Sequence, residues 1–239
     1  MSDDPMLLAI ALDVDETLIS TGGAGARSWR RAFDALWGVD ADIGKFTSGG
    51  MTDPEVGRIT FRGVMGRDPA PRELIRLMHA YLGFLPEEVA ASPGYRVLPG
   101  VEALLPRLVE THVLVGITTG AVEAAAHIKL ARAGLNRYFC FGGFGSDSKD
   151  RGELTRVAIG RAATVLGAPL DPARVCVVGD TPLDIEAAHA ACVAGIGVAT
   201  GKYTAAELEA AGADHVLGTL AEPFPGLAPR LGDASAAGR

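Results

Sequence analysis

Short apolar runs, each followed by a segment with helical periodicity, recur along this chain. An apolar run of strand length that ends in polar residues is typical of a strand buried on both faces of a parallel sheet. The predicted strands cover residues 6–12, 112–118, 174–178 and 195–199, and the predicted helices cover residues 122–133, 154–166, 185–192 and 204–211. Strands that alternate with helices predict an α/β fold, with an open, Rossmann-like parallel sheet as its core.

One stretch, from residue 24 to residue 97, breaks this alternation with helical periodicity and no buried strand. Its apolar stripes comprise Trp29, Phe33, Leu36 and Trp37, then Leu74, Leu77, Met78, Tyr81, Leu82 and Leu85. A further helix is expected after Thr52, which offers a cap two residues before Pro54. We predict an all-helical cap domain, residues 21–97, inserted into a hydrolase core of residues 1–20 and 98–239. Hinges are expected at residues 22–25 and 93–100, and a frayed tail from about residue 221.

Composition and charge exclude several classes of protein. The chain is 48% hydrophobic with a net charge of −7, which fits a globular protein and opposes nucleic-acid binding. The three cysteines, Cys140, Cys176 and Cys192, lack metal-site spacing and are predicted to be buried thiols in a reducing compartment. The start of the chain is acidic, and its first apolar run is too short to cross a bilayer. We therefore expect a cytoplasmic protein without membrane or nucleic-acid partners.

Acidic side chains follow two of the predicted strands. Asp13 and Asp15 come after the first strand, and Asp180 and Asp184 come after the strand at residues 174–178. An isolated pair of this kind is usually an ordinary polar exit from a strand, but two pairs at one sheet edge are different. At about 4 Å and an effective dielectric constant near 20, each contact between like charges costs about 4 kcal/mol. A hard divalent cation relieves this repulsion, and oxygen ligands in this number favour Mg²⁺.

These motifs resemble those of the haloacid dehalogenase superfamily over nearly the whole chain. Asp13-x-Asp15-x-Thr17, a threonine after a later strand and Gly179-Asp180-x-x-x-Asp184 occur in the superfamily's order. The resemblance implies that Asp13 is a nucleophile that becomes phosphorylated, that Asp15 is the general acid and base, and that Thr17 orients Asp15. It also implies a metal held by Asp13, the backbone carbonyl of Asp15 and Asp180, with Asp184 as a direct or water-mediated ligand.

The same resemblance implies a phosphate-binding set. Thr119, chosen over Thr118, and Gly120 would contact the phosphoryl oxygens beside a helix start. The superfamily also places one cation against the phosphate, and the candidates are Lys149 and Arg151, with Arg151 favoured. The loop at residues 50–53 either closes over the site or serves only to cap the following helix.

The position of the insert resembles that of the phosphoglycolate phosphatase-like branch. The resemblance therefore implies a Mg²⁺-dependent phosphatase that hydrolyses a small phosphorylated metabolite, with phosphoglycolate as the first candidate. A sugar phosphomutase would use the same phosphoaspartate, and a catalytically silent binding module is a second alternative. A dehalogenase would need neither a metal nor Asp15. The chain is expected to be a monomer or a homodimer.

Overall fold

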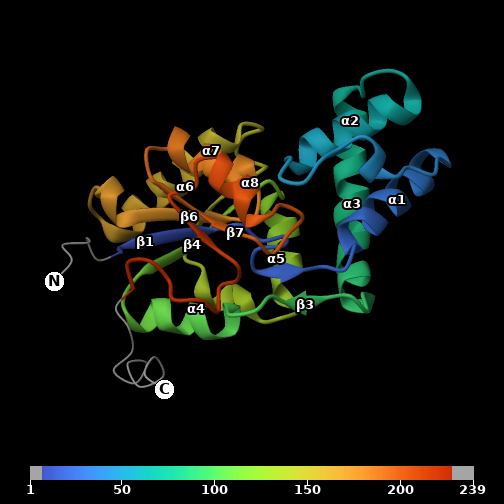
Figure 1. Cartoon of the computed structure of the whole chain (residues 1–239). Coiled ribbons are helices and arrows are strands. Elements are labelled where there is room, and N and C mark those ends of the chain that lie inside the picture. Colours follow the sequence, from blue (N-terminus) through green and yellow to red (C-terminus); the bar gives the residue numbers. More distant parts are fainter. Residues whose placement is uncertain (1–6, 228–239) are drawn as a thin grey trace.

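A six-stranded parallel sheet forms the centre of the molecule (Figure 1). The computed structural model describes residues 7–227. Its strands lie in the order β5-β4-β1-β6-β7-β8, and every neighbouring pair is parallel. Their bounds are Ala9–Leu12 (β1), Leu114–Thr119 (β4), Phe141–Phe144 (β5), Val175–Gly179 (β6), Ala194–Val198 (β7) and His215–Leu217 (β8). The α/β Rossmann-like fold predicted from the sequence is confirmed.

Helices cover both faces of this sheet, because side chains alternate along each strand. Ile10 and Leu12 of β1 pack with the core that includes α4, whereas Ala9 and Ala11 pack with α6 and α7 on the other face. Figure 1 shows α4 on one side of the strands and α6 and α7 on the other. The helices of this part are α4 (Val101–Glu110), α5 (Glu123–Ala131), α6 (Arg151–Leu166), α7 (Pro182–Ala190) and α8 (Ala205–Ala210), with short 3₁₀ turns at Leu135–Tyr138 and Pro172–Arg174.

Three further helices lie between the two short strands β2 (Ile19–Ser20) and β3 (Arg96–Val97), which pair with each other in antiparallel fashion. These helices are α1 (Ala24–Trp37), α2 (Asp53–Met65) and α3 (Pro71–Ala91), with a 3₁₀ turn at Ile43–Lys45. Trp29 of α1 stacks on Tyr81 of α3 at 4.1 Å between ring centroids, so the two predicted stripes face each other. Figure 1 shows the group beside one end of the sheet. We propose, as the sequence predicts, that residues 21–97 form a cap.

The two chain segments that join these helices to the sheet touch at glycines. Gly22 has a φ of 60°, and a Cβ on it would lie 2.5 Å from the carbonyl carbon of Gly94. The Ser92 hydroxyl also donates to the carbonyl oxygen of Thr21 at 2.8 Å. Larger residues would therefore force the two segments apart. The hinge role of residues 22–25 and 93–100 stays a prediction.

Several elements escaped the sequence reasoning. The strand β5 reads Phe-Gly-Gly-Phe, and glycine is depleted in strands. A Cβ on Gly143 would lie 1.9 Å from the carbonyl oxygen of Leu154, so this glycine lets α6 approach the sheet. The helix α4 contains Pro106, which weakens its helical signal. The predicted start of β4 at His112 is wrong, because His112 lies in a turn with a φ of 60°.

Two other expectations need correction. The tail predicted from residue 221 is wrong for residues 221–227, because Phe224 is buried in the core beside α4; residues 228–239 and the first six residues lie outside the described part. Cys176 is buried as predicted, but Cys140 and Cys192 are exposed. Cys192 has a φ of 59° in the turn after α7, which places it at the surface.

No helix within residues 7–227 has the length and apolar character needed to cross a membrane.

Candidate active site

A cavity of about 130 Å³ lies at the carboxyl edge of the sheet, where β4, β1 and β6 are neighbours. Because parallel strands end at the same edge, the residues that follow them meet there. Residues of the sheet core and of the segment before α2 line this cavity together: Asp13, Asp15, Glu16, Gly49, Gly50, Met51, Asp53, Thr119, Gly120, Ala121, Lys129, Arg151, Asp180 and Thr181. The structure thus brings together the polar ends of three predicted strands.

Two buried carboxyl groups, those of Asp13 and Asp180, face this cavity. Burial, and then the charge of Asp184, raises the pKa of Asp13 to about 7, although Arg151 opposes the shift. Burial, and then the charge of Asp13, raises the pKa of Asp180 to about 8. The Thr17 hydroxyl donates to Asp180 at 3.3 Å, so the structure places Thr17 against Asp180 rather than Asp15. The positive charge around Asp13 and Asp180 is therefore too small to keep both carboxyl groups ionised.

Arg151, at the start of α6, lies between two carboxylates. Its guanidinium donates to Asp184 and, at 3.4 Å, to Asp13. The other oxygen of Asp184 accepts from the backbone N–H and the hydroxyl of Thr181, at 3.1 and 2.7 Å. Asp184 therefore caps α7 and holds Arg151, and it does not line the 130 Å³ cavity. The expected convergence of four carboxylates is only partly realised.

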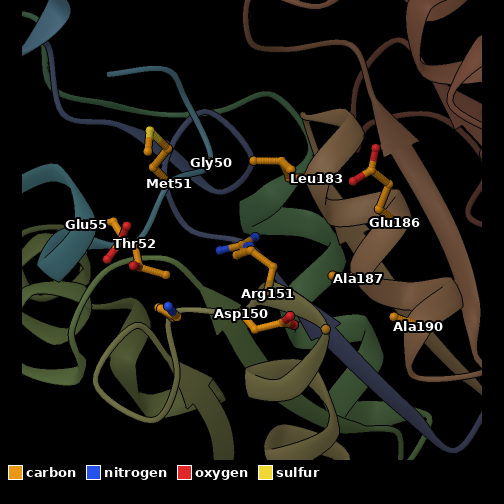
Figure 2. Close-up of a pocket in the computed structure, with 12 residues that line it drawn as sticks. Gly50, Met51, Thr52, Glu55, Asp150, Arg151, Leu183, Glu186, Ala187 and Ala190 are labelled. Carbon is orange, nitrogen blue, oxygen red and sulfur yellow. The ribbon is translucent and has the colours of Figure 1, made fainter. Parts of the chain in front are cut away.

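The second candidate cation, Lys149, lies elsewhere. It is exposed and lines a neighbouring cavity of about 430 Å³ between α2, α6 and α7. Figure 2 shows Arg151 in the middle of this region, between Thr52 on one side and Leu183 on the other. Within the described residues, Nε and Nη1 of Arg151 and the Thr52 hydroxyl are buried without a hydrogen-bond partner. The structure brings Arg151 to the carboxylates and leaves Lys149 away from them.

The two threonines that end β4 point in different directions. The Thr118 hydroxyl lies 3.0 Å from that of Thr155 in α6, so it belongs to the packing between strand and helix. Thr119 lines the cavity and hydrogen-bonds to Asp13, which lowers the pKa of that carboxyl group against the larger effect of burial. At Gly120 a Cβ would lie 2.4 Å from the carbonyl oxygen of Met51. Glycine thus permits the segment before α2 to approach the end of β4.

Asp53 fixes this segment to the sheet. Its carboxylate accepts from the backbone N–H of Val122 at 2.9 Å, and its own N–H donates to the carbonyl oxygen of Gly120 at 2.8 Å. Burial raises the pKa of Asp53 to about 6, against the opposing charge of Lys129. Thr52 occupies the N-cap position of α2, but its side chain makes no capping hydrogen bond. Of the two interpretations of residues 50–53, this geometry favours the loop that covers the cavity.

Lys129 is a site residue that the sequence reasoning missed. It lies in α5, is 5% exposed, and its ammonium group donates to Asp15 at 2.5 Å. Burial opposes the charged form, but Asp15 and then Tyr81 and Asp53 raise the pKa of Lys129 above its ordinary value. One signal was present in the sequence: Lys129 stands four residues after Ala125, on the apolar stripe of its helix. A lysine on a buried stripe needs an acidic partner.

The oxygen atoms at the cavity fit a hard cation. Within residues 7–227, three or more acidic, histidine or cysteine side chains do not gather closely enough to hold a metal ion by themselves. Asp13 and Asp180 offer two carboxylates whose pKa values are raised, which a cation would reverse. Mg²⁺ commonly binds through one or two carboxylates and keeps several waters. The carboxylates of Asp13 and Asp180 therefore fit Mg²⁺, whereas Asp184 is committed to Thr181 and Arg151. The carbonyl of Asp15 stays a predicted ligand.

Comparison with known proteins identifies the family of this chain. The family model of haloacid dehalogenase-like hydrolases matches residues 7–191. The chain belongs to this family. As a haloacid dehalogenase-like hydrolase it is an enzyme, and the sequence-based recognition of its superfamily is confirmed. No match is found among curated proteins.

Solved structures share the fold of this haloacid dehalogenase-like hydrolase. A hydrolase from Pseudomonas syringae is 25% identical, with a TM-score of 0.69 and coverage of 90% of this chain and 94% of that chain. A predicted phosphoglycolate phosphatase from Haemophilus somnus 129PT is 18% identical, with a TM-score of 0.72 and coverage of 90% and 95%. A β-phosphoglucomutase from Clostridium difficile is 18% identical, with a TM-score of 0.69 and coverage of 90% and 92%.

Proposed function

We propose that this hydrolase is a Mg²⁺-dependent phosphatase that cleaves a small phosphate monoester through an aspartyl-phosphate intermediate. The observation that carries the proposal is the placement of Asp13. Its buried carboxyl group lies at the end of β1, beside Thr119 and Arg151, in a cavity of about 130 Å³. A nucleophile, a hydroxyl donor and a guanidinium that converge on one small space are what phosphoryl transfer to a side chain requires.

In the first step, an oxygen of Asp13 attacks phosphorus, and the bond from phosphorus to the ester oxygen breaks. Asp15 gives its proton to the departing oxygen. The Thr119 hydroxyl and the guanidinium of Arg151 hydrogen-bond to the phosphoryl oxygens and hold them for in-line attack. When bound at Asp13 and Asp180, Mg²⁺ would supply the positive charge that keeps the nucleophile ionised and shields the phosphoryl group.

In the second step, water attacks the phosphorus of the aspartyl phosphate, and Asp15 accepts the proton of that water. The bond between Asp13 and phosphorus breaks, which releases inorganic phosphate and restores the carboxylate. The segment before α2 limits the access of other water, because Asp53 ties it to Gly120 and Val122 over the cavity.

The size of the cavity supports a small substrate. About 130 Å³ accommodates a phosphoryl group with a short organic part, and phosphoglycolate is the first candidate. One structure with the same fold is that of a predicted phosphoglycolate phosphatase, and another is a β-phosphoglucomutase. The adjoining cavity of about 430 Å³ shares Gly50, Met51 and Arg151 with the first, which gives a hexose phosphate room in the mutase alternative.

A panel of phosphate esters with Mg²⁺ tests this proposal. The chain is incubated with the esters phosphoglycolate, glycerol 2-phosphate and glucose 1-phosphate and with the acyl phosphate acetyl phosphate, and both inorganic phosphate and sugar isomers are measured. A phosphatase releases inorganic phosphate from the small esters. Conversion of glucose 1-phosphate to its isomer without phosphate release would instead establish the mutase, and no turnover of any ester would leave only a binding module.

The raised pKa values predict how pH affects stability without a metal. Asp13 and Asp180 titrate at about 7 and 8 in the folded chain, whereas an unfolded Asp titrates near 3.9. Between these values the folded state binds more protons, so its stability falls as pH rises from about 4 to about 8. In EDTA, we expect a lower Tm at pH 8 than at pH 5.5, and a Mg²⁺-induced rise in Tm that is larger at pH 8.

Asp180→Asn provides the control, because it removes one of the two titrating groups without changing the shape of the side chain. The fall in Tm between pH 5.5 and pH 8 should then become shallower, and the response to Mg²⁺ should weaken. A metal-free protein whose Tm rises over this interval would contradict the assignment of buried, unpaired carboxyl groups at the cavity.

A further inference from the structure

Lys129 lies where the helices α2 and α3 meet the sheet core. Its ammonium group is 2.5 Å from Asp15 of the core, and the carboxyl group of Asp53 in α2 and the phenol of Tyr81 in α3 also favour its charged form. The backbone of Lys129 is fixed as well, because the Tyr95 hydroxyl donates to its carbonyl oxygen at 2.8 Å. Lys129 is therefore in contact with the sheet core on one side and close to α2 and α3 on the other.

The two members of the ion pair differ in their surroundings. The side chain of Lys129 is 7% exposed, whereas that of Asp15 is 41% exposed. A partly exposed carboxylate at the start of a loop would sample several rotamers if nothing held it. A buried ammonium group within hydrogen-bond distance restricts that choice, because charge-assisted hydrogen bonds are about twice as strong as neutral ones. Both residues line the cavity that contains Asp13.

We propose that Lys129 is a positioning residue: it holds the carboxyl group of Asp15 where that group exchanges a proton with the leaving group and with water. This inference rests on the proposed phosphatase function. In the phosphorylation step the proton of Asp15 passes to the ester oxygen as that oxygen leaves phosphorus. If Asp15 is misplaced, the step slows only when the leaving oxygen needs a proton, so the effect of losing Lys129 depends on the leaving group.

Two kinds of substrate distinguish a loss of proton transfer from a general loss of active-site structure. Phosphoglycolate and glycerol 2-phosphate release an alkoxide, which must be protonated as it departs. Acetyl phosphate is of similar size but releases acetate, which is stable as an anion. We expect Lys129→Met to lower kcat/KM for the alkyl esters by about 10- to 100-fold, within the range of general acid catalysis. For acetyl phosphate we expect a loss below about threefold, since kcat/KM there does not depend on the acid.

Matched variants complete the experiment. Lys45→Met removes an exposed lysine outside the cavity and should leave kcat/KM for the alkyl esters and for acetyl phosphate unchanged. Lys129→Arg keeps the charge and should recover part of the alkyl-ester activity; it also replaces the Met variant if that variant does not fold. Asp15→Asn should show the same dependence on the leaving group, with a larger loss on the alkyl esters.

An equal loss on alkyl esters and acetyl phosphate would overturn the positioning role, and so would an unchanged kcat/KM for the alkyl esters. Failure of this inference is distinct from failure of the proposed function. If Asp13→Asn is inactive while Lys129→Met keeps full activity, the phosphatase mechanism stands and only the role of Lys129 falls. If Asp13→Asn retains activity, the phosphoaspartate itself is wrong.

Discussion

Asp13→Asn is expected to abolish turnover of every phosphate ester that the enzyme cleaves. The neutral amide is a poor nucleophile and cannot form the aspartyl phosphate, so kcat should fall on the order of 10⁴-fold or more. The fold should survive, because the substitution keeps the size of the side chain and replaces a buried carboxyl group whose pKa is already raised to about 7. Steady-state kinetics on phosphoglycolate and acetyl phosphate, with a thermal melt of each variant, measure both outcomes.

A matched substitution tests whether the effect is specific. Asp171→Asn changes an exposed N-cap residue of a 3₁₀ turn, and asparagine caps such turns equally well, so activity and Tm should stay at the wild-type values. Mass spectrometry of enzyme quenched during turnover should find a phosphoryl group on Asp13 in the wild type and none in Asp13→Asn. Phosphate release that persists in Asp13→Asn would exclude Asp13 as the nucleophile.

Much of the sheet could be predicted from the sequence, because its central strands are continuous apolar runs. The sequence predicts β1, β4 and β6 in this way, since strands buried on both faces consist mostly of apolar residues. The sequence does not reveal β5, because Gly143 is required by the close approach of α6 and glycine is depleted in strands. That requirement comes from tertiary packing, which a local pattern does not contain.

The sequence also predicts part of the candidate site. Asp13 and Asp180 follow strands and Thr119 ends one, and the topology of a parallel sheet brings strand ends together. Contacts between side chains could not be read in this way. Asp184 has the spacing of a ligand, but in the structure it caps α7 and binds Arg151. Lys129 reaches Asp15 across 114 positions of the chain, and neither residue belongs to a motif that includes the other.

Arg151→Met should cause the second large loss. The guanidinium contacts Asp13 and Asp184, and Nε and Nη1 have no partner within the described residues, which leaves them available to a phosphoryl group. Removing it deletes a charge that stabilises the transition state, for which a loss of about 100- to 1,000-fold in kcat/KM is typical. It also leaves two buried carboxyl groups without their cation, which costs about 3–5 kcal/mol in the free energy of unfolding.

The loss of stability in Arg151→Met should depend on pH, unlike that of an ordinary core mutation. The pKa of Asp13 is raised to about 7, so protonation removes the charge that Arg151 balances there, and the difference in Tm between Arg151→Met and wild type should shrink as pH falls from 8 to 5. Arg151→Lys keeps the charge but loses the planar fork, and should recover stability more than activity. Lys149→Met removes an exposed charge that does not line the 130 Å³ cavity, so its kcat/KM should change by less than about threefold. A large loss in Lys149→Met with little change in Arg151→Met would reverse the assignment of the phosphate-binding cation.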